Sequence, residues 1–217
     1  MPEVILTIDG QKVQAQTGMS ILQAAQNAGI DIPHLCYRED LPPTSACRLC
    51  VVEVEGARTL VASCSYPVAN NLVVKTKTPR VQEARRMVIE FLLSDHPYDC
   101  MTCEKSGSCL LEKYAYEFSI RQPRFAGETH HYPLRATNPF YERDYNKCIL
   151  CGRCVTVCHE IQFCAVVDQT NRGFQTKIAA PFDRSMQETP CVFCGNCVSV
   201  CPVGALTEKA GRFQGRE

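Results

Sequence analysis

Cysteine is the residue type whose number and spacing point to chemistry in this sequence, with 16 among 217 residues. Many of the cysteines are three positions apart, a C-x2-C spacing that favours shared metal coordination over separate disulfide bridges. The first residues, MPEVILTIDG, do not have the character of a signal peptide, and disulfides persist mainly in oxidising compartments. The sequence therefore predicts metal-bound thiolates in a cytoplasmic protein, with disulfide bridges as the weaker alternative.

An internal repeat near the end of the chain gives the strongest signal. The segments CILCGRCVTVC (148–158) and CVFCGNCVSVC (191–201) share the spacing C-x2-C-x2-C-x3-C, the bacterial run of ligands for 4Fe–4S clusters. Three cysteines of such a run bind one cluster, and the fourth binds the cluster of the other half. We therefore expect two sites related by a local pseudo-two-fold axis, one formed by Cys148, Cys151, Cys154 and Cys201, the other by Cys158, Cys191, Cys194 and Cys197.

A third set of cysteines lies in the first third of the chain. Cys36, Cys47, Cys50 and Cys64 have the spacing C-x10-C-x2-C-x13-C, a lengthened variant of the plant-type pattern for a 2Fe–2S cluster. A long loop with three thiolates, followed by a strand with the fourth, can supply the ligands of such a cluster. A structural zinc ion held by the same four cysteines is the weaker alternative.

The middle segment, HPYDCMTCEKSGSC, has one cysteine too few for a 4Fe–4S cluster. It supplies Cys100, Cys103 and Cys109, and His96 stands four residues before the first of them. A lone histidine is more often a surface or capping residue, but the deficit of one ligand favours His96 as the fourth. A neutral imidazole in place of a thiolate removes one negative charge and should raise the reduction potential, as in Rieske centres.

One cysteine remains outside these four sets. We expect Cys164, in QFCAVV, to be a small apolar core residue. The other histidines are expected to be solvated or to support the ligands without binding metal; they are His34, His130, His131 and His159.

The first part of the chain reads as a small β-rich unit. Apolar and polar residues alternate in VILTIDGQKVQAQ, and Asp9-Gly10 at its centre predicts a hairpin. SILQAAQNAG predicts a short helix that Ser20 caps and Gly29 ends. Two strand-like runs around Gly56, LCVVEVEG and TLVASC, complete the unit.

A longer helix should follow this unit. Thr78 can cap it, Pro79 suits its first turn, and Pro97 cannot continue it. Its apolar residues recur at helical spacing, at Val81, Ala84, Val88, Phe91 and Leu92. The segment 118–139 is poor in periodicity and reads as a loop, and the residues between the two halves of the repeat read as strand–turn–strand.

The bulk composition excludes several classes of function. Lys plus Arg equals Asp plus Glu at 23 each, so no basic field indicates binding to nucleic acid. No apolar run approaches the roughly 20 residues that span a bilayer. The chain carries no Gly-rich dinucleotide or phosphate-binding motif, and no Ser/His/Asp set is placed for nucleophilic catalysis.

The order of these cysteine motifs resembles a known module over nearly the whole chain. It is similar to the N-terminal region of iron-only hydrogenases, of NAD-linked formate dehydrogenases and of the large iron–sulfur subunit of complex I. As a separate chain it most resembles the small iron–sulfur (diaphorase-type) subunit of bidirectional NAD-linked hydrogenases. The resemblance implies one 2Fe–2S cluster and three 4Fe–4S clusters, with His96 in the role of the histidine ligand.

The expected fold class is α+β in three parts. Residues 1–78 should form an N-terminal β-grasp 2Fe–2S ferredoxin domain, and 79–138 a small helical segment with the His/Cys3 4Fe–4S site. Residues 139–217 should form a C-terminal ferredoxin-like domain with two 4Fe–4S clusters. No molybdopterin or hydrogenase active-site domain follows in this sequence, so we expect no catalytic site in the chain itself.

Electron transfer is the expected function. The chain would relay single electrons between a flavoprotein subunit that oxidises NAD(P)H and a hydrogenase, formate dehydrogenase or related catalytic subunit. Subunit contacts are expected on the ferredoxin-like surfaces and on the loop at 119–140. Two alternatives stay open: a detached electron-input module of a molybdopterin formate dehydrogenase or iron-only hydrogenase, and a zinc-stabilised structural or nucleic-acid-binding protein, which the missing basic patch disfavours.

Overall fold

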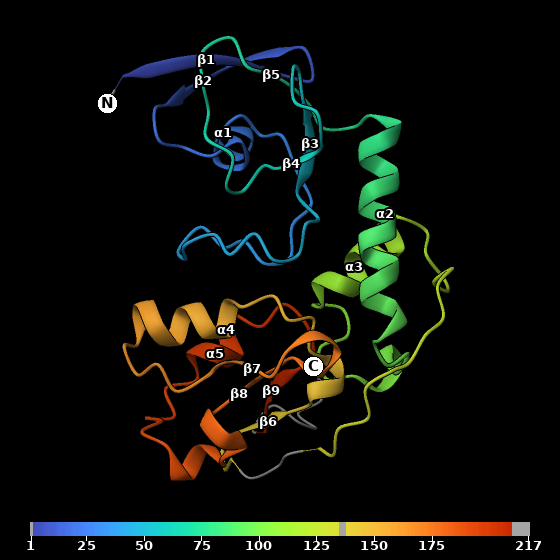
Figure 1. The fold of residues 1–217 in the computed structure, drawn as a ribbon, viewed down its shortest axis with the longest axis vertical. Helices are drawn as coiled ribbons and strands as arrows, with labels where there is room; N and C mark the ends of the chain where they lie inside the picture. The colour runs from blue at the N-terminus through green and yellow to red at the C-terminus, as the bar shows by residue number, and fades with distance from the viewer. Residues whose placement is uncertain (1, 135–137, 210–217) are drawn as a thin grey trace, which may run out of the picture.

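The computed structural model describes residues 2–134 and 138–209 of the chain. The N-terminal third forms an upper lobe, the C-terminal third forms a lower lobe, and helix α2 (Pro79–Ser94) runs between them (Figure 1). The long loop before strand β3 (Val51–Val54) extends from the upper lobe towards the lower one. The cysteines of this loop therefore lie near the junction of the two lobes.

The upper lobe is built on a five-stranded mixed sheet with the strand order β2-β1-β5-β3-β4. Neighbouring strands are antiparallel except β1 and β5, which are parallel. Helix α1 contributes Ile21, Leu22, Ala24 and Ala25 to the core beneath this sheet. Besides β3, the elements of the lobe are β1 (Glu3–Ile8), β2 (Gln11–Gln16), α1 (Ile21–Asn27), β4 (Val61–Ala62) and β5 (Val73–Lys75).

Local signals in the upper lobe behave as the sequence predicts. Asp9 and Gly10 have φ values of 50° and 85°, so both central residues of the hairpin turn are left-handed, as a tight hairpin between twisted strands requires. Ser20 and Gln23 form a reciprocal capping box at the start of α1. Gly29, with φ of 72°, follows the end of this helix.

Helix α2 confirms the predicted start, and four of the five apolar residues that recur at helical spacing are buried or half-buried. The Thr78 hydroxyl accepts a hydrogen bond from the backbone N–H of Val81 at 3.3 Å, and Pro79 occupies the first turn. Phe91, expected on the apolar stripe, is 51% exposed. The helix packs against both β3 and α3. Its buried residues include every fourth position, namely Val81, Arg85, Ile89 and Leu93.

The middle segment contains one helix that the sequence reading missed. Helix α3 (Leu110–Glu117) begins directly after Cys109 and buries Leu111 and Tyr114. A single 3-10 turn, η1 (Cys100–Thr102), precedes it. The rest of this segment up to residue 134 is irregular, as expected, and residues 135–137 lie outside the described part of the chain.

The lower lobe contains two small antiparallel sheets, β6–β9 and β7–β8. The β7–β8 pair confirms the expected strand–turn–strand between the halves of the repeat. The strands are β6 (Tyr141–Arg143), β7 (Asp168–Thr170), β8 (Lys177–Ala179) and β9 (Leu206–Glu208). The helices are α4 (Arg153–Thr156), the π-helical turn η3 (Val157–Ile161) and α5 (Asn196–Ser199), and 3-10 turns lie at η2 (Tyr145–Lys147), η4 (Gly173–Gln175), η5 (Pro181–Asp183) and η6 (Met186–Glu188).

The two cysteine runs of the lower lobe adopt the same turn. Gly152 and Gly195 both have φ of 78°, and Leu150 and Phe193, each two residues earlier, have φ of 51° and 53°. Each run then enters a short helix, α4 or α5. The duplication in sequence is therefore a duplication in backbone conformation.

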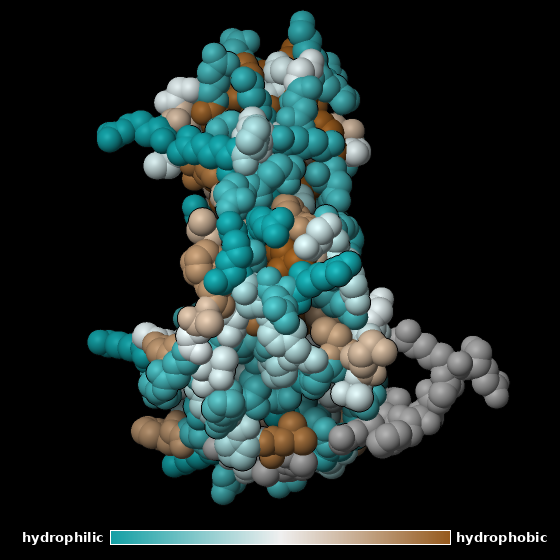
Figure 2. Space-filling view, turned by 90° about the vertical axis from the view of Figure 1, so that its right-hand side faces the viewer, coloured by the Kyte–Doolittle hydropathy of each residue, from teal (hydrophilic) through white to brown (hydrophobic). Residues whose placement is uncertain are grey.

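The surface that carries α2 is mostly hydrophilic, with apolar residues scattered at the waist between the lobes and near the lower end (Figure 2). None of the helices in the described ranges has the length and apolar character needed to cross a bilayer.

Candidate metal centres

The upper-lobe cysteines lie in mutual contact. The thiol of Cys36 is in hydrogen-bond contact with those of Cys47 and Cys64, and Cys50 contacts Cys64. The backbone N–H of Cys36 also donates to Sγ of Cys47 at 3.4 Å. All four cysteines are buried. The long loop and the strand that follows it thus bring together the four thiols that the spacing selected.

Contact between these thiols lowers the pKa of some of them and raises the pKa of others. The bond from Cys64 lowers the pKa of Cys50 to about 6. The bond to Cys36 raises the pKa of Cys47 and of Cys64 above the usual range of a thiol. Part of the set is therefore thiolate at neutral pH, the form that binds iron.

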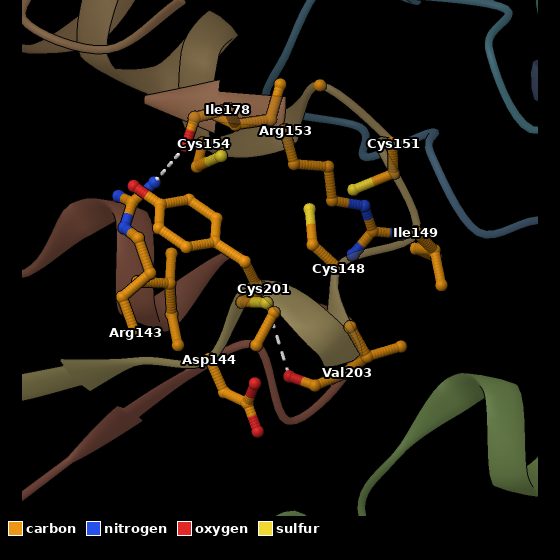
Figure 3. A pocket seen from close by; sticks show the side chains of 14 residues that line it. Arg143, Asp144, Cys148, Ile149, Cys151, Arg153, Cys154, Ile178, Cys201 and Val203 are labelled. Atoms are coloured by element: carbon orange, nitrogen blue, oxygen red, sulfur yellow. Dashed lines mark hydrogen bonds between the residues drawn. The ribbon is translucent and has the colours of Figure 1, made fainter. Parts of the chain in front are cut away.

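A pocket of the lower lobe is lined by Cys148, Cys151, Cys154 and Cys201, the first set expected from the repeat. Figure 3 shows these four sulfur-bearing side chains around the pocket, with Arg143 and Arg153 on opposite sides of it. Burial raises the pKa of Cys151 to about 12. The guanidinium of Arg143 acts in the opposite direction on the pKa of Cys154, so the site supplies positive charge to its thiolates.

A second pocket of the lower lobe is lined by Cys158, Cys191, Cys194 and Cys197, the other expected set. Cys158 lies on the π-helical turn η3, and Cys194 is exposed. Cys164 also lines this pocket, half-buried against the apolar core of the lobe. The expectation that Cys164 packs with apolar residues is therefore met, but at the edge of a thiol-lined pocket.

The third pocket lies between the end of α2 and helix α3. His96, Cys100 and Cys109 line this cavity of about 540 Å³. Cys103 is not among the lining residues, although its charge acts on both Cys100 and Cys109. The thiol of Cys103 instead lies against Gly204.

His96 is held in the protonation state that a metal ligand needs. Its Nδ1 lies 2.9 Å from the carbonyl oxygen of Pro97, so Nδ1 carries the proton and Nε2 keeps the free lone pair. Nε2 is buried and has no hydrogen-bond partner among the described residues. Burial also lowers the pKa of His96, which keeps the imidazole neutral.

The remaining histidines bond to the protein instead. Nδ1 of His34 lies 2.8 Å from the carbonyl oxygen of Ile32, and Nε2 of His159 lies 3.0 Å from that of Val167.

Across the described residues, no group of three or more His, Cys, Asp or Glu side chains is arranged to hold a single metal ion.

Direct contacts join the three parts of the chain. The hydroxyl of Thr44, in the upper-lobe cysteine loop, donates to the carbonyl oxygen of Cys151 at 3.2 Å. The backbone N–H of Leu110, at the start of α3, donates to the carbonyl oxygen of Pro202 at 2.9 Å. One apolar cluster includes Cys36, Cys47 and Cys151, with Cys109, Cys148 and Cys201 packed against it.

Buried arginines are the part of these sites that the sequence reading missed. Arg85, Arg143 and Arg153 are each no more than 7% exposed. For Arg85 the sequence held a signal of burial, because this arginine lies four residues from Val81 and four from Ile89, which are both buried. Arg143 and Arg153 carry no such local signal.

Comparison with protein families divides the chain into the same order of sites. Residues 2–79 match the 2Fe-2S iron-sulfur cluster binding domain family. Residues 85–124 match the NADH-ubiquinone oxidoreductase-G iron-sulfur binding region, and 138–207 match the ferredoxin-like domain of NADH-quinone oxidoreductase subunit 3. The chain thus contains a 2Fe–2S domain and 4Fe–4S binding regions.

Among individual proteins, subunit HndD of the NADP-reducing hydrogenase of Solidesulfovibrio fructosivorans is 47% identical over 214 residues, 96% of this chain and 36% of that protein. The mitochondrial 78 kDa subunit of NADH-ubiquinone oxidoreductase of Neurospora crassa is 38% identical over 216 residues, 99% of this chain and 29% of that protein. The chain therefore spans about a third of the length of these relatives.

A solved structure matches over most of both chains. A chain of an NAD+-reducing [NiFe]-hydrogenase in the H2-reduced state superposes with a TM-score of 0.91 at 32% identity, covering 98% of this chain and 90% of that chain. The chain belongs to the family of iron–sulfur subunits found in NAD(P)-linked hydrogenases and in NADH-quinone oxidoreductase.

Proposed function

We propose that the four residue sets bind one 2Fe–2S and three 4Fe–4S clusters. The observation that carries this proposal is the convergence of thiols far apart in sequence: Cys201 joins Cys148 at one pocket, and Cys158 joins Cys191 at the next. The upper-lobe thiols touch one another, and Nε2 of His96 is buried without a hydrogen-bond partner in the described part of the chain. Thiolate and imidazole are the donors that iron–sulfur clusters take.

Electron relay is the function that this arrangement supports best. Bound clusters would supply one-electron redox chemistry, which the side chains of this chain cannot perform themselves. The residues of the chain would supply the cluster ligands, and shared apolar packing joins the upper-lobe loop to the turn that carries Cys148 and Cys151. We propose that the chain passes single electrons between a flavoprotein that oxidises NAD(P)H and a terminal redox enzyme in the cytoplasm.

Hydrogenase is the terminal enzyme that the relatives favour. Both HndD and the solved structure carry hydrogenase in their names, so a hydrogenase partner is proposed ahead of a formate dehydrogenase. The second candidate function is that of an electron-input module for a longer catalytic chain. The observation in its favour is that the chain spans about a third of the length of its curated relatives.

Partner contacts are proposed at two places on the surface. One is the ferredoxin-like lower lobe, where the exposed side chains of Phe163 and Val192 lie near the pocket lined by Cys158 and Cys194. The other is the loop at 119–140, of which residues 135–137 are outside the described ranges.

Iron and acid-labile sulfide content of anaerobically purified protein tests the cluster proposal. About fourteen irons per chain are expected from one 2Fe–2S and three 4Fe–4S clusters. Zinc with little sulfide would reject it and support a structural metal site instead.

Reduction kinetics test the relay. The purified chain should be reduced by NADH only after the flavoprotein subunit of an NAD+-reducing hydrogenase is added, because the chain has no dinucleotide-binding motif of its own. Rapid reduction by NADH without any flavoprotein would reject the proposed place in the electron path.

A further inference from the structure

Arg153 is buried at the contact between the two lobes. Its side chain is 6% exposed. One guanidinium nitrogen donates to the carbonyl oxygen of Tyr37 at 2.7 Å, and another donates to that of Val200 at 3.5 Å. Tyr37 follows Cys36 in the upper-lobe set, and Val200 precedes Cys201 in the lower-lobe set. One side chain therefore ties together the backbones of two proposed cluster sites.

The charge of Arg153 is not neutralised by a carboxylate. Within the described parts of the chain, no Asp or Glu forms an ion pair with it, and its Nε has no hydrogen-bond partner. The nearby acid, Asp40, is paired with Arg38 at 2.7 Å. A buried guanidinium without an anion is costly, and arginine stays protonated in proteins. Its counter-charges must come from other groups.

Cluster-bound thiolates would supply those counter-charges. Cys151, Cys36 and Cys47 all act electrostatically on Arg153. The first belongs to the lower-lobe set, and the other two belong to the upper-lobe set. The hydrogen bond from Thr44 to the carbonyl oxygen of Cys151 holds the two loops against each other. The guanidinium of Arg153 therefore lies close to both sets of cysteines.

We propose that Arg153 is a positioning residue that raises the reduction potentials of two clusters together, the 2Fe–2S cluster at Cys36–Cys64 and the 4Fe–4S cluster at Cys148–Cys201. The inference rests on the proposed cluster assignment. A cluster gains one negative charge on reduction, and a buried positive charge stabilises that state more than the oxidised one. Because one guanidinium faces both sites, its charge should shift both potentials in the same direction.

Two other buried arginines provide internal comparisons. Arg85 donates to the carbonyl oxygen of Val51 at 2.9 Å and, of the thiols, is acted on by Cys50. Arg143 donates to the carbonyl oxygen of Ile178 at 2.7 Å and is acted on by Cys154 and Cys197. Arg85 thus faces the upper-lobe set alone, and Arg143 faces the two lower-lobe sets. Each arginine therefore predicts a different set of affected signals: one for Arg85, and a different pair for each of Arg143 and Arg153.

Redox titration followed by electron paramagnetic resonance tests the inference on the anaerobically purified chain. Arg153→Met should shift the midpoint potentials of the 2Fe–2S signal and of one 4Fe–4S signal to more negative values. Arg153→Lys, which keeps the charge, should leave both near their wild-type values. Arg85→Met should lower the potential of the 2Fe–2S signal only, and the exposed Arg172→Met should shift none.

The outcomes separate the inference from the cluster proposal. A chain with no iron or sulfide rejects the clusters themselves, whereas a full complement with unmoved potentials in Arg153→Met rejects only the role of Arg153. A shift in one signal alone rejects the shared role. Arg153→Gln, which keeps a donor for Tyr37 but no charge, replaces the methionine variant if that variant loses iron. If Arg153→Lys shifts both potentials as far as the uncharged variants do, lost hydrogen bonding is the cause and the inference is overturned.

Discussion

Gly204 lies against the thiol of Cys103. A Cβ atom at position 204 would stand 2.7 Å from Sγ of Cys103, closer than real Cβ atoms approach such an atom, and 3.3 Å from Cδ of Lys147. The end of the second cysteine run is therefore packed onto the loop of the His96 site. Glycine is required at position 204 by this close approach.

Gly204→Ala should disturb the His96 site selectively. The added methyl group would push Sγ of Cys103 away, because the backbone around Gly204 is fixed by Pro202, whose carbonyl oxygen accepts a hydrogen bond from Leu110. We expect the loss of about four irons per chain and of one 4Fe–4S signal. Iron analysis and electron paramagnetic resonance of the purified variant measure both.

Gly127→Ala is the matched control for this change. A Cβ at position 127 meets no atom within 4 Å, so the variant should keep all its clusters. A Gly204→Ala protein with full iron content and an unchanged spectrum would contradict the close packing of Cys103 on position 204.

His96→Ala should remove one 4Fe–4S signal and leave the others. We propose the Nε2 of His96 as the fourth donor of its site, because it is buried without a hydrogen-bond partner among the described residues and Nδ1 lies 2.9 Å from the Pro97 carbonyl oxygen. His96→Cys should restore the cluster at a more negative potential, because a thiolate adds one negative charge. Electron paramagnetic resonance with redox titration checks both variants.

The exposed His131 provides the comparison. His131→Ala should leave every signal in place. An unchanged cluster count in His96→Ala would remove His96 from the set and leave its site with three cysteines.

Sequence reasoning predicted the local elements and the cysteines that share a pocket, because both depend on short spacings along the chain. The C-x2-C-x2-C-x3-C runs predict two sets of four cysteines, and each set lines a separate pocket. Thr78 before Pro79 predicted the start of α2, and Asp9-Gly10 predicted the hairpin. These features depend on neighbours within a few residues of each other in the chain.

The features that were missed depend on contacts between distant segments. Helix α3 was not predicted because its eight residues bury only Leu111 and Tyr114, too few for a clear period. Arg153 owes its burial to Tyr37, 116 positions away, and Gly204 owes its constraint to Cys103. Helix α2 packs on two sides, so Arg85 and Glu90 are buried while Phe91 is exposed, which the apolar spacing of the helix did not indicate.

Glu90→Gln should destabilise the link between α2 and the loop that follows α3. The buried Glu90 carboxylate accepts from Nε of Arg124 at 2.8 Å, and this bond lowers the pKa of Glu90. A lowered pKa stabilises the fold above the unfolded-state value, and this stabilisation is lost as the pH falls through the lowered pKa. Thermal unfolding should show a lower Tm for the variant, by about 2–4 °C for each kcal/mol lost.

The pH dependence distinguishes this ion pair from simple packing. The gap in Tm should be constant from about pH 8 to about pH 6, well above the pKa of a glutamate, and should narrow on further acidification. A gap that widens as the pH falls would contradict the assigned role of the carboxylate.

Ile89→Ala should weaken the packing that joins the three parts of the chain. Ile89 is fully buried in the apolar cluster that also contains Leu93, Leu111 and Cys151. Removing its side chain leaves a cavity and should lower the free energy of unfolding by about 2–5 kcal/mol, whereas Ile89→Val should cost about 0.5–1.5 kcal/mol. Denaturant unfolding monitored by circular dichroism and by cluster absorbance measures both variants. Met87→Ala, on the exposed face of the same helix and 38% exposed, should change stability little, because alanine is a good helix former. An equal loss in the two alanine variants would contradict a specific contribution of Ile89 to the shared core.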